Sequence, residues 1–318
     1  MPMGSLAVHW QSGPKVGYGP PMVIEGTYTA IVTPFRDEAG QPVDWDALDA
    51  LIEAQIAGGI TGLVPCGTTG ESPTLTREEH AAVIERTVKR AKGRAQVIAG
   101  TGSNSTHEAV ASSQHAERAG VDAVMVVVPY YNRPTQDGLY GHFVAIAKSV
   151  RVPVVVYNIP ARTGADLLPE TLARIAEAAP NVVATKEATG NVLRAQKILQ
   201  MMGARMTVLS GDDALTLPMC AVGARGVISV ASNVLPAEVS RATRLALEGP
   251  ASEARKAHLA LLPVYEALFL EANPAPVKAA LALRGVMRDV VRGPVAACTE
   301  ATRKVIAAAL EAYAAGGR

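Results

Sequence analysis

Residues 152–157 read VPVVVY and residues 182–186 read VVATK, two short apolar runs that a longer segment with helix-like spacing separates. β-Branched residues dominate both runs, and such residues favour strands. Six similar runs alternate with helical patterns elsewhere in the chain: Tyr28–Val32, Thr61–Pro65, Ala95–Ala99, Ala123–Val128, Thr207–Ser210 and Gly226–Val230. Alternating strands and helices imply parallel pairing through right-handed crossovers. Eight such units predict a (β/α)8 TIM barrel rather than an open doubly wound sheet.

The chain beyond Val230 predicts a second, smaller unit. Its helical patterns exceed what the eighth barrel unit needs: Pro236–Leu247, Ser252–Leu270, Pro274–Arg284 and Pro294–Ala315. We therefore expect a catalytic barrel over residues 23–235 and a C-terminal helical subdomain over residues 236–318. A dinucleotide-binding domain is the alternative for such alternation, but no GxGxxG follows the first strand.

The N-terminal segment, residues 1–22, is rich in Gly and Pro and carries a single charge at Lys15. It lacks the apolar stretch of about 7–15 residues that a signal peptide needs, so we interpret it as a flexible extension. No run of about 18 apolar residues occurs elsewhere, and no membrane-spanning helix is expected.

Net charge, cysteine spacing and histidine spacing indicate which partners, which cellular compartment and which metal sites to expect. The net charge is +1, from 30 basic and 29 acidic side chains, without a basic stripe, so neither nucleic acid nor an anionic membrane is an expected partner. The three cysteines lack CxxC spacing, which suits a reducing cytoplasm. The six histidines form no HExxH pair, and no metal site is expected.

Lys186 ends its apolar run, where a (β/α)8 barrel places its active site. Burying a charged lysine is costly, and from this run alone a lysine with its head in water is the more common arrangement. The alternative is a desolvated amine that attacks a carbonyl to form a Schiff base. Tyr157 ends the preceding strand within reach of that amine, and its phenol could shuttle protons through Thr68 and Tyr131. A barrel tyrosine is otherwise a core residue.

Other polar groups follow the strands. The segment Gly67–Glu71 reads GTTGE, and such a turn can hold a carboxylate with its N–H and hydroxyl groups, although Gly-Thr turns are common. Arg162 follows the fifth strand, where it is either a solvated loop charge or a bidentate partner for a carboxylate. Gly211 allows close backbone approach to a ligand, and Ile228 offers a main-chain carbonyl. Asp212–Asp213 are expected to cap the next helix.

Four ordered motifs resemble those of the class I pyruvate aldolase superfamily, which comprises dihydrodipicolinate synthase, N-acetylneuraminate lyase and related enzymes. They are GTTGE at 67–71, PYY at 129–131, YNIP at 157–160 and KEATGN at 186–191. Three further segments are most similar to the dihydrodipicolinate synthase family: RTG at 162–164, SGDD at 210–213 and ANPAPVK at 272–278. The resemblance covers about residues 24–315 and does not reach residues 1–22.

This resemblance implies condensation of pyruvate with L-aspartate 4-semialdehyde to 4-hydroxy-tetrahydrodipicolinate, in lysine and diaminopimelate biosynthesis. Lys186 would form the imine, which replaces a metal or organic cofactor as the electron sink. Tyr157, Thr68 and Tyr131 would relay protons, with Tyr131 reaching the neighbouring subunit's site in a homotetramer of two tight dimers. Thr69 would hold the pyruvate carboxylate, and Arg162 the carboxylate of the semialdehyde.

The resemblance also implies an effector site for lysine at the tight-dimer interface. The matching residues are Ser72, His80, Asn104, Glu108 and Tyr130. Glu108 would pair with the effector's ammonium, although it also completes a capping box with Ser105, and His80 could equally lie on a helix surface. Arg77 departs from the responsive pattern, which has a histidine in several members.

Two other functions stay open. A sister pyruvate-dependent enzyme, such as N-acetylneuraminate lyase or a 2-keto-3-deoxy sugar-acid aldolase or dehydratase, would use Lys186 and Tyr157 equally well. Arg162-Thr163-Gly164 is the main feature against that function. A catalytically idle barrel that binds a keto acid is the second alternative, but the loss of Lys186 or Tyr157 that would mark such a protein is not seen.

Overall fold

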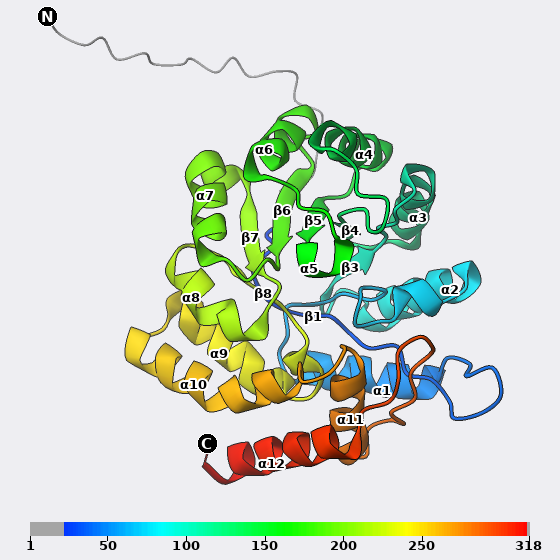
Figure 1. Cartoon of the computed structure of the whole chain (residues 1–318), viewed down its shortest axis with the longest axis vertical. Coiled ribbons are helices and arrows are strands. Elements are labelled where there is room, and N and C mark those ends of the chain that lie inside the picture. The colour runs from blue at the N-terminus through cyan, green and yellow to red at the C-terminus, as the bar shows by residue number, and fades with distance from the viewer. Residues whose placement is uncertain (1–21, 317–318) are drawn as a thin grey trace, which may run out of the picture.

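Eight parallel strands close into a barrel in the computed structural model of the protein, which describes residues 22–316 (Figure 1). Each strand pairs with the next along the chain, and β8 pairs with β1 to close the ring. This arrangement confirms the predicted (β/α)8 TIM barrel. The strands are β1 (Gly26–Thr29), β2 (Gly62–Leu63), β3 (Gln96–Gly100), β4 (Ala123–Val127), β5 (Val154–Asn158), β6 (Val182–Glu187), β7 (Thr207–Ser210) and β8 (Gly226–Ser229).

Helices surround the barrel, and their starts follow local signals in the sequence (Figure 1). The Thr76 side chain accepts the Glu79 N–H while Glu79 accepts the Thr76 N–H, which confirms the predicted capping box. The predicted box at Ser105 is only half formed, because the Glu108 carboxylate instead binds the Arg77 guanidinium. The barrel helices are α1 (Trp45–Ala57), α2 (Arg77–Ala91), α3 (Thr106–Ala119), α4 (Gln136–Ser149), α5 (Pro160–Thr163), α6 (Pro169–Ala178), α7 (Val192–Met202), α8 (Thr216–Ala221) and α9 (Pro236–Glu248).

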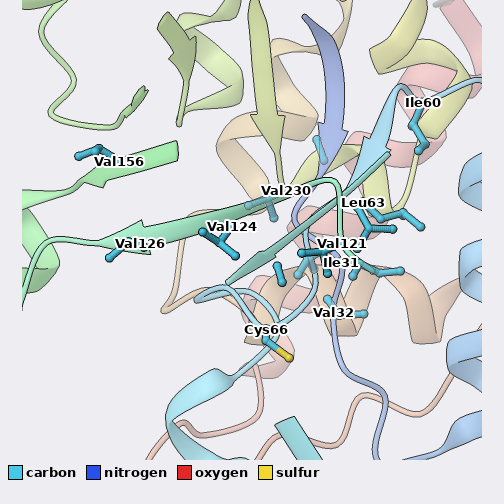
Figure 2. Packing of buried hydrophobic residues seen from close by; sticks show 14 of the residues in the cluster. Ile31, Val32, Ile60, Leu63, Cys66, Val121, Val124, Val126, Val156 and Val230 are labelled. Atoms are coloured by element: carbon cyan, nitrogen blue, oxygen red, sulfur yellow. The ribbon is translucent and has the colours of Figure 1, made fainter. Parts of the chain in front are cut away.

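The core has two parts, because alternate residues of a strand point to opposite faces. Val124 and Val126 of β4 face the helices, in one large apolar cluster with Ile31, Leu63 and Val156 (Figure 2). The residues between them on the strands face the barrel interior. That inner cluster includes Tyr28, Ile98, Met125, Val155, Tyr157, Ala184, Leu209 and Ile228.

Three more helices follow the barrel. They are α10 (Ala251–Ala267), α11 (Ala275–Leu283) and α12 (Glu300–Gly316). Helix α10 packs against α9 and α12, and α11 packs against α12. Because α9 packs against β1 and β8 as the eighth barrel helix, the three later helices are the ones that extend beyond the barrel. The boundary of the predicted subdomain at residue 236 stays a prediction.

The last helix begins at Glu300, so the predicted start at Pro294 is wrong. The periodic pattern continues through residues 294–299, but the chain there has no helical hydrogen bonding. Thr299 sets the start, since its hydroxyl accepts the N–H of Thr302 and donates to the Glu271 carboxylate. A threonine in this position satisfies a donor that the first helical turn leaves free.

The described chain begins at Met22, so residues 1–21 of the predicted flexible extension lie outside the described residues. Ile24 and Met22 pack against the inner cluster, and the Val23 carbonyl accepts a hydrogen bond from Gln96. Across residues 22–316, no helix has both the length and the apolar character that a membrane crossing requires.

Candidate active site

Lys186 and Tyr157 lie side by side at the carboxyl ends of β6 and β5, where they are direct partners in the sheet register. Val155 and Ala184, two residues earlier on each strand, face the barrel interior, and the alternation turns Lys186 and Tyr157 the same way. The Lys186 Nζ lies 4.2 Å from the centroid of the Tyr157 ring. The two residues are only 5% and 4% exposed. The lysine therefore does not extend its head into water.

A cavity of about 290 Å³ opens beside Tyr157, and Lys186 is not among its lining residues. Thr68, Tyr157 and Arg162 line it together with Tyr130. Thr68 comes from the turn after β2, Tyr157 from β5 and the exposed Arg162 from the short helix α5. Three residues that the sequence predicts for proton transfer and substrate binding thus share one cavity, large enough for small organic acids.

Gly211 lies directly after β7, and because it has no side chain, it leaves room for the Lys186 side chain. A methyl group at Gly211 would lie 2.5 Å from the Ala188 Cβ and 3.1 Å from the Lys186 Cε. Any other residue would therefore clash with Ala188 and crowd the lysine side chain. Ile228 lies within the inner cluster opposite Tyr28 and does not line the cavity.

The two aspartates after β7 have different roles. Asp212 accepts the N–H of Ala214 at 2.9 Å and caps the following 3-10 turn, as predicted. Asp213 does not cap this turn, because its carboxylate accepts the N–H groups of Val230 and Ala231 at 2.9 and 3.0 Å. Burial raises the pKa of Asp213, and these hydrogen bonds oppose the shift. Asp213 therefore anchors the loop after β8.

The segment Gly67–Glu71, which we name the glycine–threonine turn, follows β2 closely. Two non-glycine residues adopt the left-handed backbone conformation here: Cys66, just before the turn, has a φ of 56°, and Glu71, the last residue of the turn, has a φ of 54°. Inside the turn the Gly70 N–H donates to the Gly67 carbonyl at 3.1 Å. The Gly70 carbonyl accepts the Thr33 hydroxyl at 2.7 Å. Contacts from outside the turn thus hold an unusual backbone.

The two threonines of this turn differ in exposure. Thr68 lines the cavity, whereas Thr69 is 3% exposed and is not among the lining residues. The Thr69 Oγ1 accepts a hydrogen bond from the Asn273 Nδ2 at 3.0 Å. Asn273 lies just before α11, so this contact joins the C-terminal helices to the active site.

A buried ion pair, which sequence reasoning missed, ends the same turn. Lys278 of α11 is 0% exposed and pairs with the Glu71 carboxylate, and it donates to the Val290 carbonyl at 2.9 Å. Its Nζ lies 4.1 Å from the centroid of the Phe35 ring, which the Arg292 guanidinium also contacts. Burial lowers the pKa of Lys278 to about 8, and the Glu71 carboxylate opposes this shift. The amine is therefore mainly protonated at neutral pH.

A second polar cluster lies on the helix side of β6. Glu187 is 2% exposed, and its carboxylate accepts the Arg194 Nε at 3.1 Å. Arg194 also pairs with Asp166, which accepts the Asn158 Nδ2 at 2.9 Å. Burial raises the pKa of Glu187, and Arg194 is among the groups that oppose the shift. The cluster ties together the loops after β5 and β6, so it supports both Tyr157 and its neighbouring strand. Only the motifs YNIP and KEATGN signal it in the sequence.

The residues predicted for an effector site divide between two cavities. Ser72, His80 and Glu108 line a separate cavity of about 340 Å³ between α2 and α3. Tyr130 lines the active-site cavity instead, and Ser72 lines both. Asn104 lines neither cavity, and its carbonyl accepts a hydrogen bond from a side-chain amide in the next loop. His80 is not a free surface group, because its Nε2 lies 3.0 Å from a backbone carbonyl and burial lowers its pKa.

Arg77 also lines the cavity between α2 and α3 and contacts Glu108 there. The Arg77 Nη2 lies 2.7 Å from the Glu108 Oε1, although the two side chains are 84% and 48% exposed. Ser103 donates to the other Glu108 oxygen at 3.1 Å. The carboxylate predicted to bind an effector ammonium therefore already has a cationic partner.

Tyr131 does not line either cavity. It is 88% exposed in the loop after β4, with a left-handed φ of 74° and an N–H that donates to the Thr163 carbonyl. The backbone of the loop is thus held while the side chain extends outward. Within residues 22–316, no group of three or more His, Cys, Asp or Glu side chains is placed to hold a metal ion.

A buried lysine beside a tyrosine at the mouth of a (β/α)8 barrel resembles the site of class I aldolases, which form a Schiff base with a carbonyl substrate. A sequence model of the dihydrodipicolinate synthetase family (DHDPS) matches residues 23–313. The chain belongs to this family, which confirms the predicted resemblance.

Curated relatives and solved structures agree with this assignment. The 4-hydroxy-tetrahydrodipicolinate synthase of Sorangium cellulosum is 58% identical over 287 residues, which is 90% of this chain and 95% of that protein. A chloride-inhibited dihydrodipicolinate synthase from Acinetobacter baumannii, solved with pyruvate, is 40% identical with a TM-score of 0.89, covering 92% of this chain and 99% of that chain. DHDPS from Cyanidioschyzon merolae, solved with lysine bound, is 38% identical with a TM-score of 0.88, and the match covers 91% of this chain and 98% of that chain.

Proposed function

We propose that this enzyme condenses pyruvate with L-aspartate 4-semialdehyde to give 4-hydroxy-tetrahydrodipicolinate, a step of lysine and diaminopimelate biosynthesis. One observation carries the proposal: the Lys186 amine is buried 4.2 Å from the Tyr157 ring at the mouth of the barrel. The Sorangium cellulosum relative, 58% identical, carries this activity in its name. The lyase class and the aldolase-type mechanism follow from that reaction.

The first half of the reaction uses Lys186. Its amine adds to the ketone carbon of pyruvate, water leaves, and a protonated imine forms. The imine withdraws electrons from the adjacent methyl group, which then loses a proton to give an enamine. Tyr157 contacts the amine and carries protons to and from this centre, with Thr68 as the next hydroxyl on the cavity wall. The glycine–threonine turn holds the pyruvate carboxylate, with Thr69 among its donors.

The second half forms the carbon–carbon bond. The enamine carbon attacks the aldehyde carbon of the semialdehyde, and the aldehyde oxygen takes up a proton. The semialdehyde's own amine then attacks the imine carbon, which closes the ring and releases Lys186. Arg162 lines the cavity with its side chain partly in solvent, and its guanidinium fork suits the carboxylate of this second substrate. Gly211 keeps the space around Lys186 open.

Borohydride trapping tests the proposal, because it reduces an imine to a stable amine. With pyruvate present, the peptide that contains Lys186 should gain the mass of a reduced pyruvate adduct, and Lys186→Ala should abolish the adduct. Lys304→Met, at an exposed lysine of α12, is the matched lysine variant, and it should keep the adduct. An adduct on Lys278, or on no lysine, contradicts the mechanism. Efficient cleavage of N-acetylneuraminate by the unmodified enzyme contradicts the substrate assignment.

The exposed Tyr131 supports a further part of the proposal, an oligomeric active site. The 88% exposure of Tyr131 in its own subunit supports a role in which it enters a neighbouring site and completes the relay with Tyr157 and Thr68. We propose a homotetramer of two tight dimers, in which each dimer contains two complete sites.

Lysine is the proposed effector. The cavity between α2 and α3 offers the Glu108 carboxylate, the Ser72 hydroxyl and His80 to a molecule with both an ammonium and a carboxylate. The solved DHDPS from Cyanidioschyzon merolae contains bound lysine. Because Ser72 lines this cavity and the active-site cavity, an occupant of one cavity can bias the shape of the other.

The proposed compartment is the cytoplasm. Cys66, Cys220 and Cys298 are all free thiols, and two of them are buried. Free thiols of this kind suit a reducing environment. Together with the proposed biosynthetic role, they support a cytoplasmic enzyme.

A further inference from the structure

Residues around α11 contact the glycine–threonine turn at three points. The Asn273 Nδ2 donates to the Thr69 Oγ1 at 3.0 Å. Lys278 forms an ion pair with Glu71, and the Arg292 N–H donates to the Glu71 Oε2 at 2.9 Å. The four side chains in the first two contacts are each no more than 6% exposed. Buried polar contacts fix a local geometry more firmly than surface contacts do, although the Asn273 Oδ1 itself has no hydrogen-bond partner among residues 22–316.

The contact at Thr69 also constrains a proton. A threonine hydroxyl carries one hydrogen to donate and two lone pairs that accept. The Asn273 amide occupies a lone pair, so the Thr69 hydrogen is directed elsewhere. Within residues 22–316 the Thr69 hydroxyl donates to no protein acceptor, and the neighbouring Thr68 lines the active-site cavity. A substrate carboxylate in that cavity is a suitable acceptor for it.

The ion pair constrains the backbone at the other end of the turn. Glu71 has a left-handed φ of 54°, which a glutamate adopts only when its surroundings hold it there. The partner Lys278 is itself fixed, because its Nζ donates to the Val290 carbonyl and contacts the Phe35 ring. Removing one member would leave a buried charge without its partner, which is strongly destabilising.

We propose that Asn273 and Lys278 are positioning residues for the reaction: they hold the glycine–threonine turn, and the Thr69 hydroxyl on it, in the arrangement that binds the substrate's carboxylate. The inference rests on the proposed function, in which the glycine–threonine turn binds the carboxylate of pyruvate. It adds that the pyruvate subsite is assembled from two parts of the chain, the loop after β2 and the segment around α11.

A double-mutant cycle tests the role of Asn273. Asn273→Ala should raise the pyruvate KM, and the pyruvate concentration for half-maximal borohydride trapping, by about tenfold, the loss expected for one hydrogen bond to a charged group. The kcat and the KM for the semialdehyde should change by less than about threefold, because the chemistry and the Arg162 subsite are untouched. In a Thr69→Val background, Asn273→Ala should shift the pyruvate KM by less than about twofold, since its effect acts through the missing hydroxyl.

Two variants test the ion pair. Lys278→Met leaves the Glu71 carboxylate buried without its ion-pair partner, and this variant will unfold or lose much of its thermal stability. The double variant Glu71→Gln/Lys278→Met removes both charges and keeps similar volumes, so it should fold. Its pyruvate KM should rise several-fold, with kcat and the semialdehyde KM retained, because the turn is held less firmly.

Matched controls separate positioning from general stability. Asn181 donates to three backbone carbonyls, at 2.8–3.3 Å, before β6 and thus at the opposite end of the barrel. Asn181→Ala should lower Tm without raising the pyruvate KM. Lys304 is exposed on α12, and Lys304→Met should change neither quantity.

The outcomes distinguish this inference from the proposed function. If the unmodified enzyme forms no pyruvate adduct at Lys186, the proposed function fails. If it forms the adduct but Asn273→Ala leaves the pyruvate KM unchanged, or raises it equally with and without Thr69, the role of Asn273 is overturned. An unchanged pyruvate KM in Glu71→Gln/Lys278→Met overturns the role of the ion pair.

Discussion

At the scale of single residues, the active site depends on how strands alternate. Lys186 and Tyr157 are partners on adjacent strands, and each lies two positions after a residue that faces the barrel interior. A lysine one position later would occupy the place of Glu187, on the helix side, where an arginine neutralises the carboxylate. The position of the amine within the strand thus decides whether it meets a substrate or the outer core.

Arg162 should separate the two halves of the reaction. Arg162→Ala should raise the semialdehyde KM by about tenfold to a hundredfold, as expected when a guanidinium–carboxylate contact is lost. Imine formation with pyruvate should change by less than about threefold, because Arg162 reaches the cavity from α5 while Lys186 lies on β6. Separate KM values for the two substrates, with borohydride trapping, provide the measurement. Arg174→Ala, on the exposed surface of α6, is the control. Equal loss of both steps would show that Arg162 does not hold the second substrate.

At the scale of elements, the ends of helices decide which groups are free to bind a ligand. Glu108 lies in the first turn of α3, where it was predicted to close a capping box. Instead it extends to Arg77 at the start of α2. The pair joins the two helices across the proposed effector cavity, and because both side chains are substantially exposed, the contact is weak.

Arg77 should therefore weaken lysine binding without preventing it. Arg77→Ala should lower the lysine concentration for half-maximal inhibition by about two- to fivefold, since the Glu108 carboxylate no longer has to exchange partners. Glu108→Ala should raise that concentration by more than about tenfold. Condensation assays with lysine titrations measure both, each relative to the variant's own uninhibited rate. Inhibition that is absent in the unmodified enzyme, or unchanged in Glu108→Ala, rules this site out.

At the scale of the whole molecule, the chain forms one barrel, and a second subunit could supply a side chain to its active site. The loop after β4 presents Tyr130 to its own active-site cavity and Tyr131 to solvent, although the two residues are adjacent. A side chain of this size at 88% exposure, with a firmly bonded backbone, is suited to contact a second subunit.

Mixed dimers provide the test for Tyr131. Tyr131→Phe and Lys186→Ala homodimers should each be about 100-fold or more less active than the unmodified enzyme. When the two variants share a dimer, one site keeps its own Lys186 and receives an intact Tyr131 from the other subunit. Co-expressed, differently tagged and doubly purified mixed dimers should thus recover about half of the normal rate per dimer. If Tyr131 acts within its own subunit, no mixed dimer recovers activity.

The barrel and the central pair of the site could be predicted from the sequence because their signals are local. Each strand is a short β-branched run, and a barrel places every strand end at one face, so Lys186 and Tyr157 were expected together. The Lys278–Glu71 pair could not be predicted, because a single lysine in an apolar helix does not indicate which distant carboxylate it meets. The start of α12 was missed for a related reason: periodicity continued through residues 294–299, while the Glu271 contact that fixes Thr299 comes from another segment.

The contact between α11 and the glycine–threonine turn has a consequence for how the enzyme is made. A ribosome delivers the turn early and Asn273 and Lys278 late, after β8 has become available to pair with β1. A growing chain therefore carries Lys186 and Tyr157 before it has a fixed place for the keto acid's carboxylate. Domains generally fold as units during synthesis, and here the last part of the unit completes the substrate site. If Asn273 holds the turn as proposed, a nascent chain binds pyruvate only weakly until α11 has been made, so firm capture of the keto acid is the last property that the fold acquires.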